Sequence, residues 1–180
     1  MVRVVAYVFL SCFVLSTLTQ GVRVSRAANQ DPVLQGNELL QLSEEQNKTD
    51  HGLALTTAQE ALTLLQPTND KTSIANAYFQ IGRCHHALSN FTEATQNYQA
   101  ALELFRDLNK PDDQAETLIM LAYVEQRKAE WLNAIAYYDQ AQPLIQNDPA
   151  RLAKIASGMA DLFNENGLPE SALIQYQRAL

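Results

Sequence analysis

The chain has 180 residues, 47% of them hydrophobic, with only six glycines and six prolines, which excludes a disordered chain and disfavours a turn-rich β-sandwich. Residues 1–27 hold Arg3, Arg23 and Arg26 and no acid, so that 10 basic residues face 20 acidic residues downstream. A surface of that sign repels phosphate backbones and anionic lipid headgroups, so we expect protein or peptide partners and neither nucleic acid nor membrane surfaces.

The first predicted element is an export signal in residues 1–27. A basic start at Arg3 precedes the uncharged apolar run Val4–Leu18, and polar residues follow it. As a helix this run reaches about 22 Å, short of the roughly 30 Å hydrocarbon core, which favours a cleaved signal peptide over the alternative of an N-terminal membrane anchor. Small residues suit cleavage at Thr19–Gly21 or at Ser25–Ala27. We therefore expect a periplasmic or secreted protein.

Residues 28–50 form the next segment, which is more polar than the chain that follows. We expect a helix near Val33 to Glu45 that acts as an N-terminal cap, because the terminal units of repeat arrays are atypical.

Small and aromatic residues then recur with a period of 40. This step carries Gly82 to Ala122, Ala94 to Ala134 and Tyr98 to Tyr138. A step of 40 backwards from Ala94 and Ala101 reaches Ala54 and Ala61, and a step of 38 forwards from the third unit reaches Ala172, Tyr176 and Ala179. Residues 28–180 are therefore predicted to be one repeat array with units of about 33–70, 71–110, 111–148 and 149–180, the last one incomplete.

Breaker residues separate the predicted helices. Clusters at 66–70, 109–113 and 147–149 lie between units, and shorter turns at 89–90, 128–130 and 166–169 join the two helices within a unit. Pro143 falls in the last turn of a second helix and is expected to bend it.

The spacing resembles the signature of the tetratricopeptide repeat family, W-x2-L-G-x2-Y on one helix and A-x3-F on the next. The best unit matches it with Tyr78, Ile81, Gly82 and His85, followed by Ala94, Tyr98 and Ala101. The resemblance implies an all-α fold, a right-handed superhelix of helix-turn-helix repeats, or α-solenoid. It extends to the 40-residue arrays of exported, cyanobacterial-type proteins. Gly82, Ala122 and Ala160 would let the paired helices approach closely.

The resemblance also implies that first helices line a concave groove that binds a partner. Phe79 and Tyr123 are expected to be exposed aromatic side chains that a partner covers. The Lys and Asn carboxylate clamp of some family members is not matched, because Phe79 and Arg83 hold one of the corresponding pairs. The predicted groove residues are Asn76, Phe79, Arg83, His86, Glu116, Ile119, Tyr123, Gln126, Lys154, Ser157, Asp161 and Asn164.

No residue pattern indicates catalysis, a metal or a cofactor. Cys84, His85 and His86 are adjacent, so on a helix their side chains point about 100° apart and do not converge on one ion. We expect Cys84 to be a buried, inert thiol. The sequence holds no glycine-rich phosphate loop, G-x-S-x-G elbow or H-E-x-x-H motif, so this segment is predicted not to be an enzyme.

The leading hypothesis is an exported scaffold that binds a peptide or protein segment in its groove. One alternative is the recognition arm of a larger enzyme, such as a caspase-like CHAT protease, and another is a structural role in envelope assembly. Because the chain stops at Leu180 inside a predicted second helix, we expect either a longer protein or association through that uncapped end.

Overall fold

The structure is a computed structural model that describes residues 31–145, 147–165 and 174. The predicted signal peptide lies outside these residues, as does the second helix of the fourth unit, with Ala172, Tyr176 and Ala179, apart from Ile174. The regular elements of the described part are all helices. None of these helices has the length and apolar character needed to cross a membrane.

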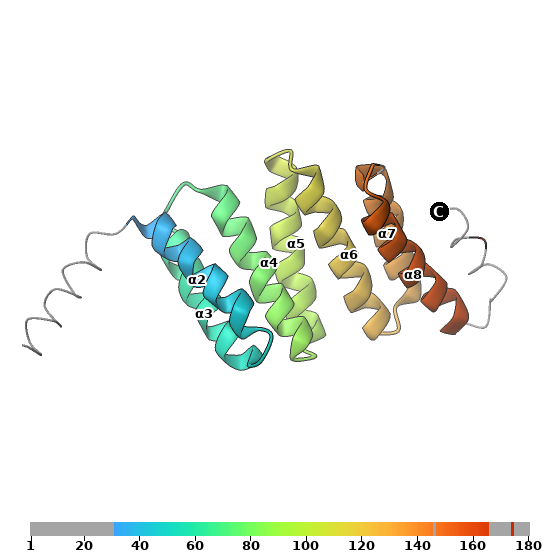
Figure 1. The fold of residues 1–180 in the computed structure, drawn as a ribbon, viewed down its shortest axis with the longest axis horizontal. Coiled ribbons are helices and arrows are strands. Elements are labelled where there is room, and N and C mark those ends of the chain that lie inside the picture. The colour runs from blue at the N-terminus through green and yellow to red at the C-terminus, as the bar shows by residue number, and fades with distance from the viewer. Residues whose placement is uncertain (1–30, 146, 166–173, 175–180) are drawn as a thin grey trace, which may run out of the picture.

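The helices follow one another as antiparallel pairs in a single row (Figure 1). The pairs are α2 with α3, α4 with α5, and α6 with α7, and α2 also lies against α4 as α6 does against α8. This arrangement confirms the predicted all-α solenoid. The elements are α2 (Pro32–Gln46), α3 (His51–Leu65), α4 (Lys71–Ala87), α5 (Phe91–Asp107), α6 (Pro111–Arg127), α7 (Trp131–Ala141), the 3-10 helix η1 (Gln142–Ile145) and α8 (Pro149–Glu165).

Aspartate side chains cap the three helices α2, α3 and α4. Asp31, Asp50 and Asp70 accept hydrogen bonds from backbone N–H groups in the first turns of α2, α3 and α4. Pro111 was expected in a loop, and this prediction was wrong, because it opens α6 at a position where a helix needs no N–H donor. Pro143 was expected to bend the last turn of the second helix, but α7 ends at Ala141 and Pro143 lies within η1.

Small side chains allow the paired helices to cross closely. A Cβ atom added to Gly82 would lie 2.7 Å from the Tyr98 ring, so only glycine fits at this crossing as it stands. Ala94 of α5 is fully buried, as is Ala134 in the next pair. In the first pair Ser43 takes the corresponding place, and its hydroxyl donates to the Ala54 carbonyl at 2.8 Å.

Two tyrosines fill the space between neighbouring pairs. Tyr98 and Tyr138 are fully buried in the largest hydrophobic cluster, which joins α5, α6, α7 and α8. Within the described part of the chain neither hydroxyl has a hydrogen-bond partner. Gly158 of α8 is pressed against the Tyr138 hydroxyl, so a residue that the repeat pattern did not single out also permits close packing.

The helix predicted near residues 33–45 is present as α2, the first helix of the first unit. α2 packs along α3 and also contacts α4, in the way that α6 relates to α7 and α8. Gly36 lies against Leu65, where a Cβ would come within 2.6 Å of the leucine side chain. The polar residues of α2 therefore belong to a repeat unit, and the exposed face of α2 continues that of α4.

Candidate functional site

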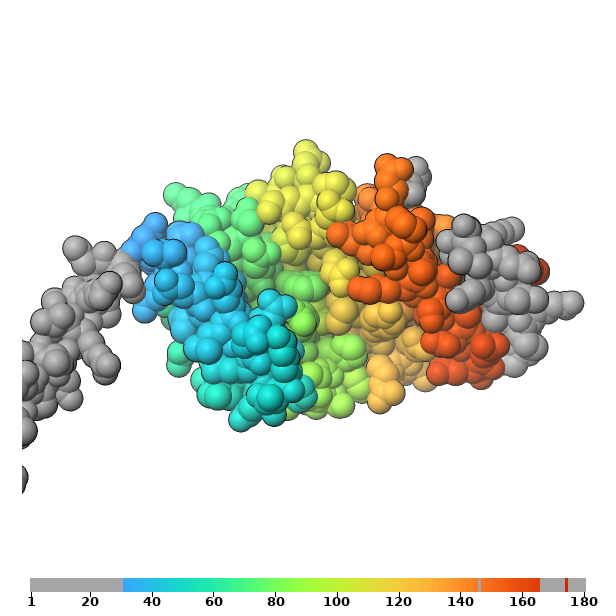
Figure 2. All heavy atoms as spheres, viewed as in Figure 1, coloured from blue at the N-terminus to red at the C-terminus, as the bar shows by residue number. Residues whose placement is uncertain are grey.

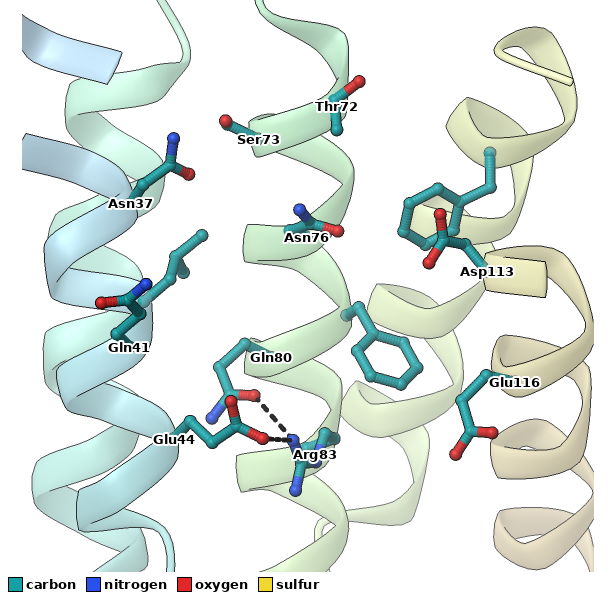
Figure 3. Close-up of a pocket in the computed structure, with 13 residues that line it drawn as sticks. Asn37, Gln41, Glu44, Thr72, Ser73, Asn76, Gln80, Arg83, Asp113 and Glu116 are labelled. Atoms are coloured by element: carbon teal, nitrogen blue, oxygen red, sulfur yellow. Dashed lines mark hydrogen bonds and ion pairs between the residues drawn. The ribbon is translucent and has the colours of Figure 1, made fainter. Parts of the chain in front are cut away.

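A pocket of about 600 Å³ lies on the face formed by the successive first helices α2, α4 and α6 (Figure 3). In the space-filling view the blue surface of α2 and the orange surface of α8 flank the green and yellow surface of the middle of the array (Figure 2). Phe105 from α5 also contributes to the lining. The other lining residues are Asn37, Leu40, Gln41, Glu44, Thr72, Ser73, Asn76, Phe79, Gln80, Arg83, Asp113 and Glu116.

Helical spacing explains why these residues share one face. On α4 the lining residues Asn76, Phe79 and Arg83 follow one another at intervals of three and four, which places them on one stripe. On α2 the residues Asn37 and Glu44 repeat this stripe 39 positions earlier. The same repeat that builds the solenoid therefore builds the wall of the pocket.

A hydrogen-bonded network joins α2 to α4 across the pocket. The Arg83 guanidinium donates to the Glu44 carboxylate at 2.9 Å and to the Gln80 amide oxygen at 3.3 Å (Figure 3). The Gln80 amide nitrogen in turn donates to the Ser43 hydroxyl at 3.4 Å. Gln80 is 94% buried, so its hydrogen bonds fix the orientation of the Arg83 side chain.

The opposite wall of the pocket is acidic. Asp113 and Glu116 project from α6 (Figure 3). Their nearest cations are Lys110, 3.7 Å from Asp113, and Lys154 of α8, 4.0 Å from Glu116. Both separations are too long for hydrogen bonds. The two walls therefore differ, with a satisfied ion pair on one side and loosely paired carboxylates on the other.

The structure brings four of the twelve predicted groove residues together in this pocket: Asn76, Phe79, Arg83 and Glu116. Ile119 was expected in the groove, but it is only 1% exposed and belongs to the core, because α6 turns this position towards the neighbouring helices.

Phe79 and Tyr123 are not exposed aromatics as predicted. Both are half-buried and packed on core tyrosines, Phe79 on Tyr98 with ring centres 5.5 Å apart and Tyr123 on Tyr138 at 6.0 Å. Burial raises the pKa of Tyr123, and the carboxylates of Glu116 and Asp161 raise it further. Each aromatic therefore presents only part of its ring to the groove.

The remaining predicted residues lie along the same array but outside the pocket. His86 packs against Phe91 with ring centres 6.2 Å apart, and burial, assisted by the charge of Arg127, lowers the pKa of its imidazole. Gln126 is half-buried at the end of α6. On α8 the residues Lys154, Ser157, Asp161 and Asn164 are exposed.

Sequence reasoning missed the part of the site that α2 contributes. Asn37, Gln41 and Glu44 line the pocket, yet the polar composition of their segment suggested only a cap. A uniform step of 39 relates them to Asn76, Gln80 and Arg83, and that step was the signal that would have identified them.

Within the described residues no three histidine, cysteine, aspartate or glutamate side chains are grouped so as to hold a metal ion. Cys84 is a buried free thiol 3.9 Å from the Ser43 hydroxyl, and burial raises the pKa of the thiol. A buried thiol of raised pKa is a poor nucleophile, so Cys84 is unsuited to covalent chemistry.

Comparison with known proteins identifies relatives and structures that this chain is similar to. Residues 45–107 match the model of the tetratricopeptide repeat family. Photosystem I assembly protein Ycf3 from Synechococcus elongatus is 36% identical over 90 residues, which cover 50% of this chain and 50% of the relative. The match thus spans about half the length of this curated relative.

Solved structures resemble the fold at low sequence identity. Aspartyl phosphate phosphatase F from Bacillus subtilis gives a TM-score of 0.78 at 13% identity, over 83% of this chain and 40% of that one. BtubC from P. vanneervenii gives 0.77 at 20% identity, over 84% of this chain and 64% of that one. Repeats of this kind form protein–protein interaction scaffolds that bind protein or peptide partners. Residues 45–107 thus match the tetratricopeptide repeat, and the helix pairs with their recurring small and aromatic residues continue the same architecture on both sides of this segment.

Proposed function

We propose that this protein is an exported scaffold that binds an extended segment of a partner protein in the groove along α2, α4 and α6. The observation that carries the proposal is the pocket of about 600 Å³, which successive first helices line with equivalent polar residues. The similarity to a photosystem I assembly protein supports a protein as the partner.

The pocket chemistry suits a peptide backbone. Asn37 and Asn76 occupy equivalent places on α2 and α4, and each amide can donate and accept a hydrogen bond at once, as a peptide group requires (Figure 3). Phe79 and Leu40 supply apolar surface between them. Because the helices are fixed by their packing, the groove is preformed and a ligand loses little affinity to reorganisation of the protein.

Export is the second part of the proposal, and the apolar run Val4–Leu18 behind Arg3 supports it. Expression of the full chain in a bacterial host, followed by fractionation and intact-mass measurement, tests it. We expect a periplasmic product that begins within residues 20–28. A full-length product in the cytoplasm would contradict export without affecting the groove.

The groove is tested by selecting peptides on the full chain from a displayed random library and measuring their affinity by fluorescence anisotropy. Replacing both asparagines, Asn37→Ala with Asn76→Ala, removes about two hydrogen bonds, so we expect roughly tenfold weaker binding. Asn133→Ala is the matched control, because Asn133 is exposed on α7 outside the pocket. Hydrogen exchange should also slow in α2 and α4 when the peptide is added. Undiminished affinity in the double variant would place the binding site elsewhere.

A further inference from the structure

We infer that the groove selects segments with basic side chains, and that Asp113 and Glu116 on the α6 wall receive them. This inference rests on the proposed peptide-binding function and names the chemistry of its ligand. The pocket lining contains three acidic residues, Glu44, Asp113 and Glu116, and a single basic one, Arg83. The occupant favoured by charge complementarity is therefore cationic.

Arg83, the one basic residue of the pocket lining, is already paired within the protein. Arg83 is bound to Glu44 at 2.9 Å and to Gln80 at 3.3 Å, and Gln80 is itself held by Ser43. An acidic ligand would have to compete with Glu44 for this guanidinium. The α2 and α4 wall consequently offers the ligand little net charge.

The α6 wall has acceptor capacity to spare. Lys110 and Lys154 remain 3.7 and 4.0 Å from Asp113 and Glu116, and within the described part of the chain no hydrogen bond is made to either carboxylate. Both lysines lie towards solvent, and the side chains of Asp113 and Glu116 are 45% and 36% exposed. An ammonium or guanidinium group from a ligand can therefore form charge-assisted hydrogen bonds that the protein itself leaves unmade.

Aromatic surface beside these carboxylates strengthens the case for a cation. Phe79 lines the pocket with Glu116, and Tyr123 lies within the field of both Glu116 and Asp161. The face of an aromatic ring attracts a cation, and acidic groups at its rim add to this attraction. The groove beyond the pocket thus continues with the same combination of partly exposed ring and carboxylate.

The test compares three fluorescein-labelled nonapeptide pools that are degenerate except at three alternate positions, fixed as lysine, glutamine or glutamate. Binding to the full chain is measured by anisotropy at low and high salt. We expect the lysine pool to bind about tenfold more tightly than the glutamine pool at low salt, and the glutamate pool to bind most weakly. The preference should shrink at high salt because mobile ions screen exposed charges.

The location is tested with the isosteric variant Asp113→Asn with Glu116→Gln, which should remove most of the lysine preference. The matched control is Asp139→Asn with Glu103→Gln, two exposed residues on second helices outside the pocket. A preference that survives the groove variant, or the tightest binding by the glutamate pool, would overturn the inference. If all three pools bind equally, and binding weakens in the variant Asn37→Ala with Asn76→Ala, charge selection alone is overturned and the groove function stands. Absence of binding by any pool would overturn both.

Discussion

The α2/α3 pair and the α4/α5 pair make the same helix crossing with different side chains. In α4/α5 a glycine, Gly82, faces the large ring of Tyr98. In α2/α3 the equivalent positions hold Ser43 and Ala58, and the serine hydroxyl donates to the Ala54 carbonyl. In the α4/α5 crossing an aromatic ring thus packs against the glycine backbone. In the α2/α3 crossing a buried hydrogen bond links two small residues.

The difference shows that the repeat accepts different residues at these two positions, a large ring opposite glycine in one pair and two small residues in the other. Tyr98 belongs to a cluster that reaches through α8, whereas the α2/α3 pair contributes to a smaller cluster around Leu40 and Leu65. Since burial of large rings contributes most to packing energy, we expect the α4/α5 crossing to be the more stable of the two.

The largest effect expected is from Tyr98→Ala, which gives α5 the small residue found at Ala58. Loss of the buried ring should lower the free energy of unfolding by about 3–5 kcal/mol, as measured by urea denaturation. Tyr98→Phe is the control, because the hydroxyl has no hydrogen-bond partner in the described residues and its removal should be nearly neutral. A cost below about 1 kcal/mol for the alanine variant would show that the two crossings are equivalent after all.

Gly82→Ala comes next. The new Cβ would lie 2.7 Å from the Tyr98 ring, and overpacking of this kind costs about 1–3 kcal/mol. Better helix propensity returns up to about 1 kcal/mol, so we expect a net loss of about 1–2 kcal/mol. Thermal unfolding followed by circular dichroism measures it. In the double variant with Tyr98→Ala the cost should disappear, and additive costs would refute the proposed contact.

Ser43→Ala should cost about 1 kcal/mol, because it removes the hydrogen bond to Ala54 and leaves the buried Gln80 amide without its acceptor. The same change is also expected to loosen Arg83, which Gln80 supports. Denaturant titration provides the first measurement and the affinity for a selected peptide the second. Unchanged stability would show that the hydroxyl contributes nothing to the first crossing.

The smallest effect concerns acid stability at the junction of the two pairs. Hydrogen bonds from the Ser73 side chain and backbone hold the pKa of Asp70 below its ordinary value of 3.8. A carboxyl of lowered pKa stabilises the folded state above about pH 4, and this contribution is lost as the pH falls through the folded-state pKa. Asp70→Ala should therefore cost about 1 kcal/mol at neutral pH and less in acid.

Urea denaturation at neutral and acid pH, with Asp139→Ala as control, measures this difference. Asp139 is exposed on α7 and caps no helix. A cost for the Asp70 variant that does not change with pH would assign the effect to packing instead of to the charged cap.

The repeat pattern allowed the fold to be predicted, because the crossing residues are steric requirements that recur at fixed spacing. Gly82, Ala94 and Tyr98 are all buried where the pattern required it. The first pair was harder to recognise, since Ser43 and Ala58 satisfy the same requirement with residues that do not match the signature.

The candidate site was predicted only in part. The resemblance to tetratricopeptide repeats assigned Asn76, Phe79, Arg83 and Glu116 to the groove, and these residues line the pocket. Spacing does not tell how far a neighbouring helix covers a given stripe, so Ile119 was placed in the groove although α6 buries it. The contribution of Glu44 depends on an ion pair 39 residues away, which composition alone does not reveal.

The step of 39 between Asn37 and Asn76 is the length of one repeat, and each repeat contributes one first helix to the row. Each first helix that joins the row therefore adds its own set of lining side chains to the groove. A protein of this design would tune the length of the segment that it recognises by gaining or losing whole repeats, with no new interface to invent.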